Sequence, residues 1–202
     1  MARVTKSQEF IELAKRFGNT PWCDDYEKMI SGMLYDSFVP ELVEGRLRAR
    51  KLIKKYNDYL PDEATPESLA RDREAMLAQL LGYYGCNIIV GDGVYANFGL
   101  VVLDCAIVRI GDRTILGPNV HIYAATHPTS VKERREIPDY SKEVTIGDDC
   151  WIGGNSVIMP GVAIGNGVTV GACSVVTKDI PSYSVALGSP AKVVKTLDEA
   201  ER

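Results

Sequence analysis

The sequence IGDDCWIGGNSVIMPGVAIGNGVTVGACSVV, residues 146–176, decides the fold. An aliphatic residue recurs in it at every sixth position, and glycine directly follows four of these six residues. A period of six fits neither a free helix, with about 3.6 residues per turn, nor an isolated strand, which alternates. It is typical of a solenoid of hexapeptide repeats, in which short strands meet at sharp corners. The aliphatic positions are Ile146, Ile152, Ile158, Ile164, Val170 and Val176.

The same spacing appears earlier in the chain, at Ile110, Leu116 and Ile122. When the aliphatic positions are taken in threes, glycine follows the first two members of each set and not the third. We therefore predict a three-sided coil whose aliphatic side chains point inward and whose successive turns pair as parallel strands. Glycine is expected to provide the backbone freedom that a tight corner needs. The alternative, a run of unrelated short strands with glycine turns, requires all these positions to share one register by coincidence.

The composition is typical of a soluble globular protein, with 202 residues, 46% hydrophobic and 25% charged. The net charge of −4 argues against a general affinity for nucleic acid. No apolar run reaches membrane-spanning length, and the start MARVTKSQEF lacks the apolar core of a signal peptide, so we expect a cytoplasmic protein. The five cysteines are widely spaced and contain no CxxC pair, which indicates reduced, mostly buried thiols.

Helical patterns precede the repeat, and we expect these helices to cover the open end of the first coil. They are predicted at residues 7–17, at residues 24–32, from Pro40 onward and from Thr65 onward. The two longer helices are expected to bury apolar faces, formed by Leu42, Val43, Leu47, Leu52, Ile53 and Tyr56 in one and by Leu69, Met76, Leu77, Leu80 and Leu81 in the other. The helix from Pro40 is also strongly basic; a solvated face is commoner for such a pattern than a binding surface for nucleic acid or a calmodulin-type partner.

The repeat is irregular at two places. Val90 and Ile110 are twenty positions apart, two more than one coil requires, so the register slips within residues 95–111. Such a slip marks either a site or an ordinary bulge. Between Ile122 and Ile146 the pattern stops and then resumes in phase, which predicts a polar excursion loop over residues 123–143.

Only two histidines are present, which limits the chemistry. His127 lies on the excursion loop and is a candidate general base near neutral pH. His121 directly precedes an inward position, has no evident partner and is predicted to be structural. Two histidines cannot provide a three-histidine zinc site, and no Cys/His cluster has zinc spacing, so we expect no metal. The sequence also lacks a nucleophile elbow, a phosphate-binding P-loop and a dinucleotide fingerprint.

Several stretches resemble the hexapeptide-repeat acetyltransferases, in the branch of the maltose and galactoside O-acetyltransferases. They are YANF at 95–98, HIYAATHP at 121–128, VTIGDDCWIGGNSVIMPGVAIG at 144–165, VVTKDIP at 175–181 and GSPAKVV at 188–194. Upstream, GMLYDSF and ELVEGRLRARKLIKKYN are similar to the helical N-terminal domain of that branch. The resemblance runs from about Asp25 to Lys195. It implies a mainly β protein, a left-handed parallel β-helix with a small helical N-terminal domain, which assembles as a homotrimer.

The resemblance also implies a division of the chain. Residues 1–22 are expected to form an N-terminal helical extension and residues 23–85 the helical domain. Residues 86–181 are expected to form the β-helix with its excursion loop, and residues 182–202 a C-terminal tail.

The activity implied by the resemblance is direct transfer of the acetyl group from acetyl-CoA to a hydroxyl of a small sugar. His127, in THP, matches the catalytic base of the family. Asn97, in YANF, matches an asparagine that binds substrate and cofactor and supports the transition state. Asp36, in LYDSF, matches the carboxylate that binds acceptor hydroxyls, and Tyr95 is expected to be a further acceptor contact.

Two departures from the family concern the acceptor. Galactoside-type members carry two acids where this chain reads Leu103-Asp104-Cys105, so either Asp104 or Cys105 holds the position that contacts the substrate. Tyr83 stands where relatives often have Ser or Asp in contact with the acceptor. These differences favour maltose or glucose over a galactoside.

On the cofactor side, Gly154, in WIGG, matches a position whose backbone amide lies near the thioester, where it could bind an oxyanion. Other matches lie along the wall of the solenoid and in the tail. Lysine replaces the arginine of some relatives at the two tail positions that contact the nucleotide phosphates, which keeps the charge and loses the bidentate fork. These matches are Ala172, Thr177 and Lys178 on the wall and Lys192 and Lys195 in the tail.

Two alternatives differ from this interpretation. One is a hexapeptide acetyltransferase that acts on a non-sugar acceptor. The other is a non-catalytic solenoid that serves as an assembly scaffold and binds no acetyl-CoA.

Overall fold

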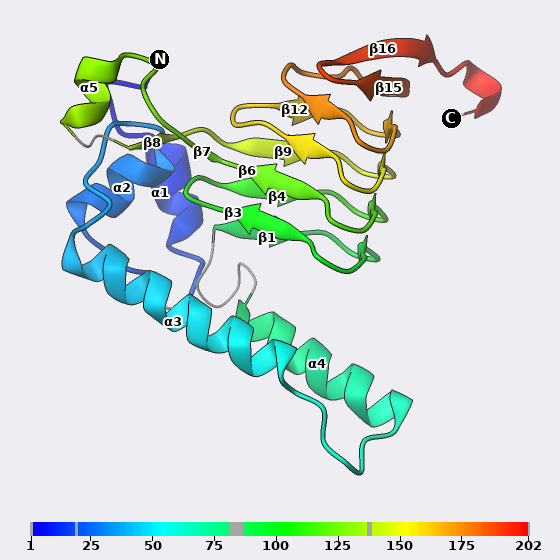
Figure 1. The fold of residues 1–202 in the computed structure, drawn as a ribbon, viewed down its shortest axis with the longest axis horizontal. Coiled ribbons are helices and arrows are strands. Elements are labelled where there is room, and N and C mark those ends of the chain that lie inside the picture. Colours follow the sequence, from blue (N-terminus) through cyan, green and yellow to red (C-terminus); the bar gives the residue numbers. More distant parts are fainter. Residues whose placement is uncertain (1, 19, 81–86, 137–138, 202) are drawn as a thin grey trace.

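The structure is a computed structural model that describes residues 2–18, 20–80, 87–136 and 139–201, so Tyr83 lies outside the described residues. A stack of β coils carries helices at its first coil and along one edge, and a short turn of helix lies at the opposite end (Figure 1). The helices are α1 (Gln8–Ala14), α2 (Asp24–Ile30), α3 (Pro40–Asn57), α4 (Pro66–Leu80), α5 (Val131–Arg135) and a 3₁₀ turn at Glu199–Glu201.

The coils have three sides, and each side is a sheet of short strands. The first sheet contains β1 (Ile88–Val90), β4 (Val108–Ile110), β9 (Val144–Ile146) and β12 (Ala163–Ile164). The second contains β2 (Tyr95–Ala96), β5 (Ile115–Leu116), β10 (Trp151–Ile152), β13 (Thr169–Val170), β15 (Ser184–Gly188) and β16 (Ala191–Thr196). The third contains β3 (Val101–Leu103), β6 (His121–Tyr123), β11 (Val157–Ile158) and β14 (Val175–Val176). All pairs in these sheets are parallel except β15 with β16, which confirms the predicted left-handed β-helix.

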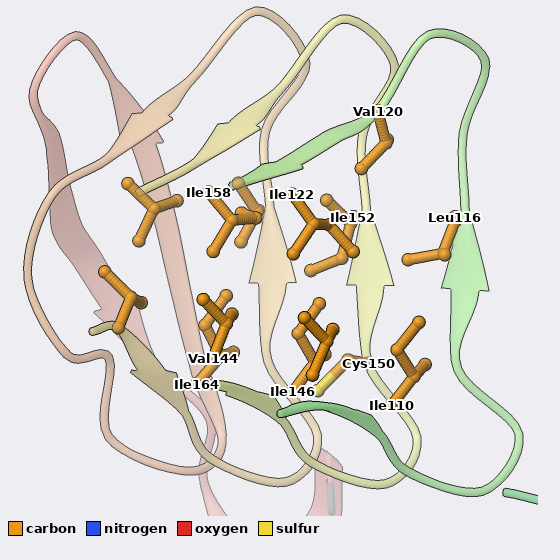
Figure 2. Packing of buried hydrophobic residues seen from close by; sticks show 14 of the residues in the cluster. Ile110, Leu116, Val120, Ile122, Val144, Ile146, Cys150, Ile152, Ile158 and Ile164 are labelled. Atoms are coloured by element: carbon orange, nitrogen blue, oxygen red, sulfur yellow. The ribbon is translucent and has the colours of Figure 1, made fainter. Parts of the chain in front are cut away.

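The interior of the coil is formed by two rows of side chains (Figure 2). All nine aliphatic positions predicted from the six-residue period are buried, and none is more than 4% exposed. The second row lies two residues before the first, because side chains alternate along a strand and i and i+2 share a face. It is equally buried and consists of Val108, Thr114, Val120, Val144, Cys150, Ser156, Val162, Val168 and Ser174.

Small polar members of the second row bind backbone carbonyls at the corners. Thr114 Oγ1 donates to the carbonyl of Gly147 at 2.8 Å. Ser156 and Ser174 both donate to the carbonyl of Gly171, at 3.1 and 2.6 Å. A hydroxyl at these buried positions is therefore satisfied by the adjacent corner, as buried polar groups generally must be.

Close packing between coils, rather than backbone freedom, explains the corner glycines. A Cβ atom on Gly117 would lie 2.6 Å from the nitrogen of Gly154, and one on Gly153 would lie 2.5 Å from the nitrogen of Ala172. The left-handed conformation occurs two residues later instead, for example at Asn155 with φ of 58°. The prediction that glycine provides the turn's backbone freedom was therefore wrong in its physical reason.

The register slip lies at the corner between the third sheet and the next coil. β1 pairs with β4 so that Val90 faces Ile110, and the two extra residues follow β3. They bring Ile107 out of the coil interior and into a separate cluster formed with the helices, where it is completely buried. The excursion loop leaves from the same corner one coil later, so both irregularities lie where the helices join the solenoid.

The helices pack against the solenoid unequally. α1 and α2 contribute Phe10, Tyr26 and Ile30 to the cluster around Ile107, which lies outside the coil interior. α3 buries only Leu42 there, and Leu47 is 51% exposed. In α4, Leu69 and Met76 are half-buried and Leu77 is exposed. The apolar faces predicted for α3 and α4 are therefore largely open in the single chain, because α4 packs on α3 rather than on the coil (Figure 1).

Candidate active site

The excursion loop holds His127 beside an acidic partner. β7 (Ala125–Thr126) and β8 (Tyr140–Ser141) pair antiparallel, which brings the residue after β7 next to the residue before β8. His127 Nδ1 lies 2.8 Å from Asp139 Oδ1, and the two side chains are 63% and 24% exposed. A carboxylate only accepts, so Nδ1 carries the proton and Nε2 keeps a lone pair on the solvent side. This arrangement suits a general base.

The helical region supports this pair from behind. The backbone N–H of Tyr35 donates to the carbonyl of Asp139 at 3.0 Å. The next residue, Asp36, is exposed, and its Oδ1 accepts the N–H of Phe38 at 2.8 Å. Ser141, at the end of β8, donates its hydroxyl to the carbonyl of Met29 in α2. Asp36 therefore directly follows Tyr35, the residue whose N–H holds the backbone of Asp139 in place.

Asn97 lies elsewhere on the coil. It follows β2 at the corner between the second and third sheets, and its Oδ1 accepts the N–H of Phe98 at 2.7 Å. His127 follows the other end of the third sheet, beyond β6. Among the described residues no hydrogen bond joins the two side chains, and the third sheet separates them within one chain. A single chain therefore presents the two predicted catalytic groups at opposite edges of one face.

Asp104 is engaged inside the protein. Its Oδ2 accepts the N–H of Asn87 at 2.8 Å, and Asn87 Nδ2 donates to the carbonyl of Asp104 at 2.8 Å. The Tyr26 hydroxyl donates to Asn87 Oδ1 at 2.7 Å, which links α2 to the first coil. Burial raises the pKa of Asp104, and the hydrogen bond from Asn87 opposes that rise. This carboxyl joins the helices to the coil, and Cys105 is the neighbour that faces Tyr35.

Gly154 and Ala172 lie on successive coils at the corner that also carries Asn97. Their approach is tight, since a Cβ atom on Gly154 would lie 3.0 Å from Pro118. Within the described residues, the half-buried N–H of Gly154 has no acceptor. A fixed N–H of this kind can bind a developing oxyanion. Thr177 and Lys178 are exposed at the end of β14, on the opposite edge of the third sheet.

A β-bulge brings the two tail lysines to one face. β15 pairs with β16 so that Val185 faces Lys195 and Leu187 faces Lys192, with the register shift between Val185 and Ala186. Without the shift, residues three apart would point to opposite sides of the strand. Val185 belongs to the outer row of the second sheet, so both lysines lie on the outer face of that sheet.

An exposed apolar column occupies the same outer face. Tyr95, Ile115 and Trp151 are aligned by the register of β2, β5 and β10, and each is about half exposed. Tyr95, predicted as an acceptor contact, is thus placed on the sheet that carries the two lysines. Sequence patterns did not indicate the column, because its members do not share one residue type.

His121 has a partner, contrary to the sequence prediction. Its Nδ1 lies 2.5 Å from the hydroxyl of Tyr123, two residues along β6. Residues i and i+2 of a strand share a face, so the spacing in HIY was a usable indication of this contact. Asp139 was also missed, because four acids lie in the excursion loop and nothing in their spacing distinguishes the one opposite His127.

The described cysteines, Cys23, Cys105, Cys150 and Cys173, are free thiols, of which Cys150 is buried and Cys173 exposed. In the described part of the chain, no three His, Cys, Asp or Glu side chains gather in a way that could hold a metal ion. None of the described helices is both long and apolar enough to cross a membrane.

Comparison with known proteins identifies two family patterns. Residues 28–85 match the maltose acetyltransferase hexapeptide capping motif, and residues 143–178 match the bacterial transferase hexapeptide of six repeats. Galactoside O-acetyltransferase of Escherichia coli (strain K12) is 36% identical over 184 residues, which cover 87% of this chain and 91% of the relative.

Two solved structures share the fold over nearly their whole length. A maltose O-acetyltransferase from Clostridium difficile 630 has a TM-score of 0.81 at 40% identity, covering 88% of this chain and 99% of its own. A hexapeptide-repeat acetyltransferase from Vibrio cholerae, solved with acetyl coenzyme A, has a TM-score of 0.77 at 31% identity, covering 88% and 100%. The chain belongs to the hexapeptide-repeat acetyltransferase family, in its maltose and galactoside O-acetyltransferase branch.

Proposed function

We propose that the protein transfers the acetyl group of acetyl-CoA to a hydroxyl of a small sugar. The observation that carries this proposal is the contact between His127 and Asp139, which holds an exposed imidazole with Nε2 available as a base. Support also comes from the relatives, which include galactoside and maltose O-acetyltransferases and a structure solved with acetyl coenzyme A.

The proposed step is direct transfer in a ternary complex. His127 Nε2 removes the proton of the sugar hydroxyl while that oxygen attacks the thioester carbonyl. The tetrahedral oxyanion accepts a hydrogen bond from the N–H of Gly154, with Asn97 as a second polar contact. Collapse breaks the carbon–sulfur bond, and the departing thiolate takes the proton from the imidazolium. Asp139 stabilises the imidazolium that exists between these two proton transfers, in the manner of a positioning carboxylate.

The cofactor is proposed to lie along the solenoid, with Ala172, Thr177 and Lys178 beside its pantetheine arm. Lys192 and Lys195 share a face and two positive charges, which suits the phosphates of the nucleotide end. Because lysine binds a phosphate as a point charge, these contacts have less geometric specificity than arginine forks.

The acceptor is proposed to bind between Asp36 and Tyr95, with maltose or glucose as the substrate. Asp36 offers an exposed carboxylate beside the His127 pair, and a carboxylate accepts two hydroxyl donors. Since Asn97 and His127 occupy opposite edges of the third sheet, we propose that each site combines Asn97 of one chain with His127 of a neighbouring chain in a homotrimer.

The test measures free CoA release with acetyl-CoA and a panel of maltose, glucose, galactosides and non-sugar alcohols. We expect the His127→Ala variant to lose about 10²–10⁴-fold in kcat, the usual contribution of a general base. Asp139→Asn should lose ~10²-fold or more, whereas Asp139→Glu should recover part of the rate because it restores the carboxylate. Glu133→Gln, an exposed change in the same loop, serves as the control and should leave the rate unchanged.

Wild-type turnover by His127→Ala would show that another group is the base. Turnover only with non-sugar alcohols would overturn the sugar assignment while leaving acetyl transfer in place. The absence of any calorimetric signal on titration with acetyl-CoA would favour the scaffold interpretation.

A further inference from the structure

The outer face of the third sheet carries a histidine and a tyrosine in contact with each other. Ile122 is buried inside the coil, so its neighbours on β6, His121 and Tyr123, point outward. His121 Nδ1 lies 2.5 Å from the Tyr123 hydroxyl, and both side chains are half-buried. Among the described residues, Nε2 of His121 has no hydrogen-bond partner. Neither residue has a part in the acetyl transfer proposed above.

The surroundings of this pair are apolar. The register of the sheet places Val101 and Val157 on either side of His121. Leu103 lies beside Tyr123 in the same way. The outward positions of β3, β6, β11 and β14, all of which the structure describes, carry no charged residue. An imidazole with one unpartnered nitrogen thus lies on an uncharged and largely aliphatic face.

The homotrimer proposed above turns this face toward the symmetry axis. Each proposed site joins Asn97 of one chain to His127 of a neighbour, and the two residues lie at opposite edges of the third sheet. In a ring of three, a chain therefore meets one neighbour at each edge, and the sheet between the edges faces the axis. The uncharged face suits this position, because it would otherwise be exposed to water. Three His121 side chains, one from each chain, then face one another across the axis.

Rotational symmetry leaves these three imidazoles without partners among themselves. The contact with Tyr123 is the same in each chain and fixes one tautomer, so the three Nε2 atoms are either all donors or all acceptors. Two donors, or two acceptors, cannot form a hydrogen bond with each other, and the valines beside His121 offer no polar group. Because buried polar groups require a partner, an occupant on the axis has to provide it.

We propose that a Zn²⁺ ion binds on the three-fold axis, coordinated by Nε2 of His121 from each of the three chains. Three imidazoles with a water molecule in the fourth position are a known ligand set for Zn²⁺. A metal-ligating histidine generally donates its other ring N–H to an oxygen, and the Tyr123 hydroxyl is in place to accept it. The proposal rests on the homotrimer of the proposed function, and it assigns the ion to assembly rather than to acetyl transfer.

The axis changes what two histidines per chain can do. The sequence excludes a three-histidine site within one chain, and the described part of one chain holds no metal cluster. On a three-fold axis, one histidine per chain is enough to provide three ligands. The other histidine, His127, is 63% exposed on the excursion loop, and its Nδ1 faces Asp139. His127 therefore does not belong to the axial site, and it offers a matched control.

The test is calorimetric titration of the chelator-treated full-length protein with Zn²⁺. We expect one ion per three chains, a stoichiometry that a site within one chain cannot produce. His121→Gln should abolish this binding, and Tyr123→Phe should weaken it by ~10–100-fold, the usual effect of removing a hydrogen bond to a metal ligand. His127→Gln should bind Zn²⁺ like the wild type. Light scattering verifies that each variant is a trimer, and if His121→Gln does not assemble, the result for Tyr123→Phe decides.

The outcomes separate this proposal from the proposed function. An active trimer that binds no Zn²⁺ up to about 1 mM would overturn the axial site and leave acetyl transfer in place. One ion per chain, or binding that survives His121→Gln, would also overturn it. A trimer whose melting temperature rises with chloride and not with Zn²⁺ would show that the Nε2 atoms are donors around an anion, which contradicts the proposal. A protein that remains a single chain would overturn the axial ion together with the shared site.

Discussion

Asp104 is a half-buried carboxyl group that connects the helices to the first coil through Asn87 and Tyr26. Its pKa is raised by burial above the ordinary 3.8, so the folded state holds this proton more tightly than the unfolded chain does. The associated stability is fully present below that pH and is lost as the pH rises through the folded pKa. Near neutral pH the protein therefore carries the cost of a charge in a poorly solvated place.

We predict that Asp104→Asn stabilises the protein at pH 8. The amide oxygen can still accept the N–H of Asn87, while the charge is removed. The melting temperature should rise by ~2–4 °C, the shift that about 1 kcal/mol produces in a protein of this size. Thermal denaturation from pH 4 to pH 8 should show a smaller decline for the variant than for the wild type. Asp62→Asn, an exposed change in the α3–α4 connection, is the control; a variant less stable than the wild type at every pH would show that the carboxylate form is required.

At the scale of single residues, the sequence indicated candidate site residues better than it indicated the residues that they contact. His127 and Asp36 could be named because each lies in a short, specific motif. The partner Asp139 depends on how β7 and β8 pair, and antiparallel register is not encoded in the local pattern of so short a hairpin. The sequence left the acceptor contact open between Asp104 and Cys105, and it did not indicate the contact of Asp104 with Asn87, because that contact depends on a two-residue slip whose direction, toward the helices, only the packing of Ile107 reveals.

Among the elements of the fold, the strands and corners of the coil were predicted best from the sequence. A period of six identified the coils between Ile110 and Val176, because each inward aliphatic position there meets the same environment. The second inward row was missed because Thr, Ser, Cys and Val share no obvious pattern of hydrophobicity. The apolar faces of α3 and α4 were predicted to be buried, and they are largely exposed. A helical pattern shows which side of a helix is apolar, but it does not show whether another element covers that side.

The corner glycines allow a matched test of their role. At Gly111 a Cβ atom would lie 2.5 Å from the carbonyl carbon of Gly147, in the next coil. Gly93 instead has φ of 67°, and the atom nearest to a Cβ built on it would be Cγ of the Arg113 side chain, at 3.5 Å. We predict that Gly111→Ala lowers the free energy of unfolding by about 1–3 kcal/mol, because the coils must separate. Gly93→Asn should change it by only a few tenths, because asparagine tolerates the left-handed region.

Urea denaturation of both variants would measure these effects. If backbone freedom were the reason for the corner glycines, Gly111→Asn would be nearly neutral, because asparagine tolerates the left-handed region. A neutral Gly111→Asn would therefore contradict the close-packing explanation, which predicts a loss at least as large as that of Gly111→Ala.

At the scale of the whole molecule, the single chain leaves an incomplete surface. The outer face of the second sheet exposes Tyr95, Ile115 and Trp151 in one column, and Trp151 is 54% exposed. A contiguous apolar column on a sheet is commonly a contact between subunits. Assembly would also solve the separation of Asn97 from His127, because a neighbouring chain can bring the two edges together. Sequence resemblance predicted this homotrimer, and the geometry of one chain supplies a physical reason for it.

We predict a particle with three times the chain mass of 22.2 kDa in light scattering. Trp151→Glu would place a charge on the apolar column that assembly buries, which costs several kcal/mol when no partner is present. The variant should dissociate to single chains and lose acetyl transfer by at least ~10²-fold, because each chain then carries only part of the site. Leu60→Glu, which changes an apolar residue in the α3–α4 connection that is more exposed than Trp151, should remain trimeric and active. A Trp151→Glu chain that is monomeric and fully active would show that one chain holds a complete site, and Asn97 would then have no part in the reaction at His127.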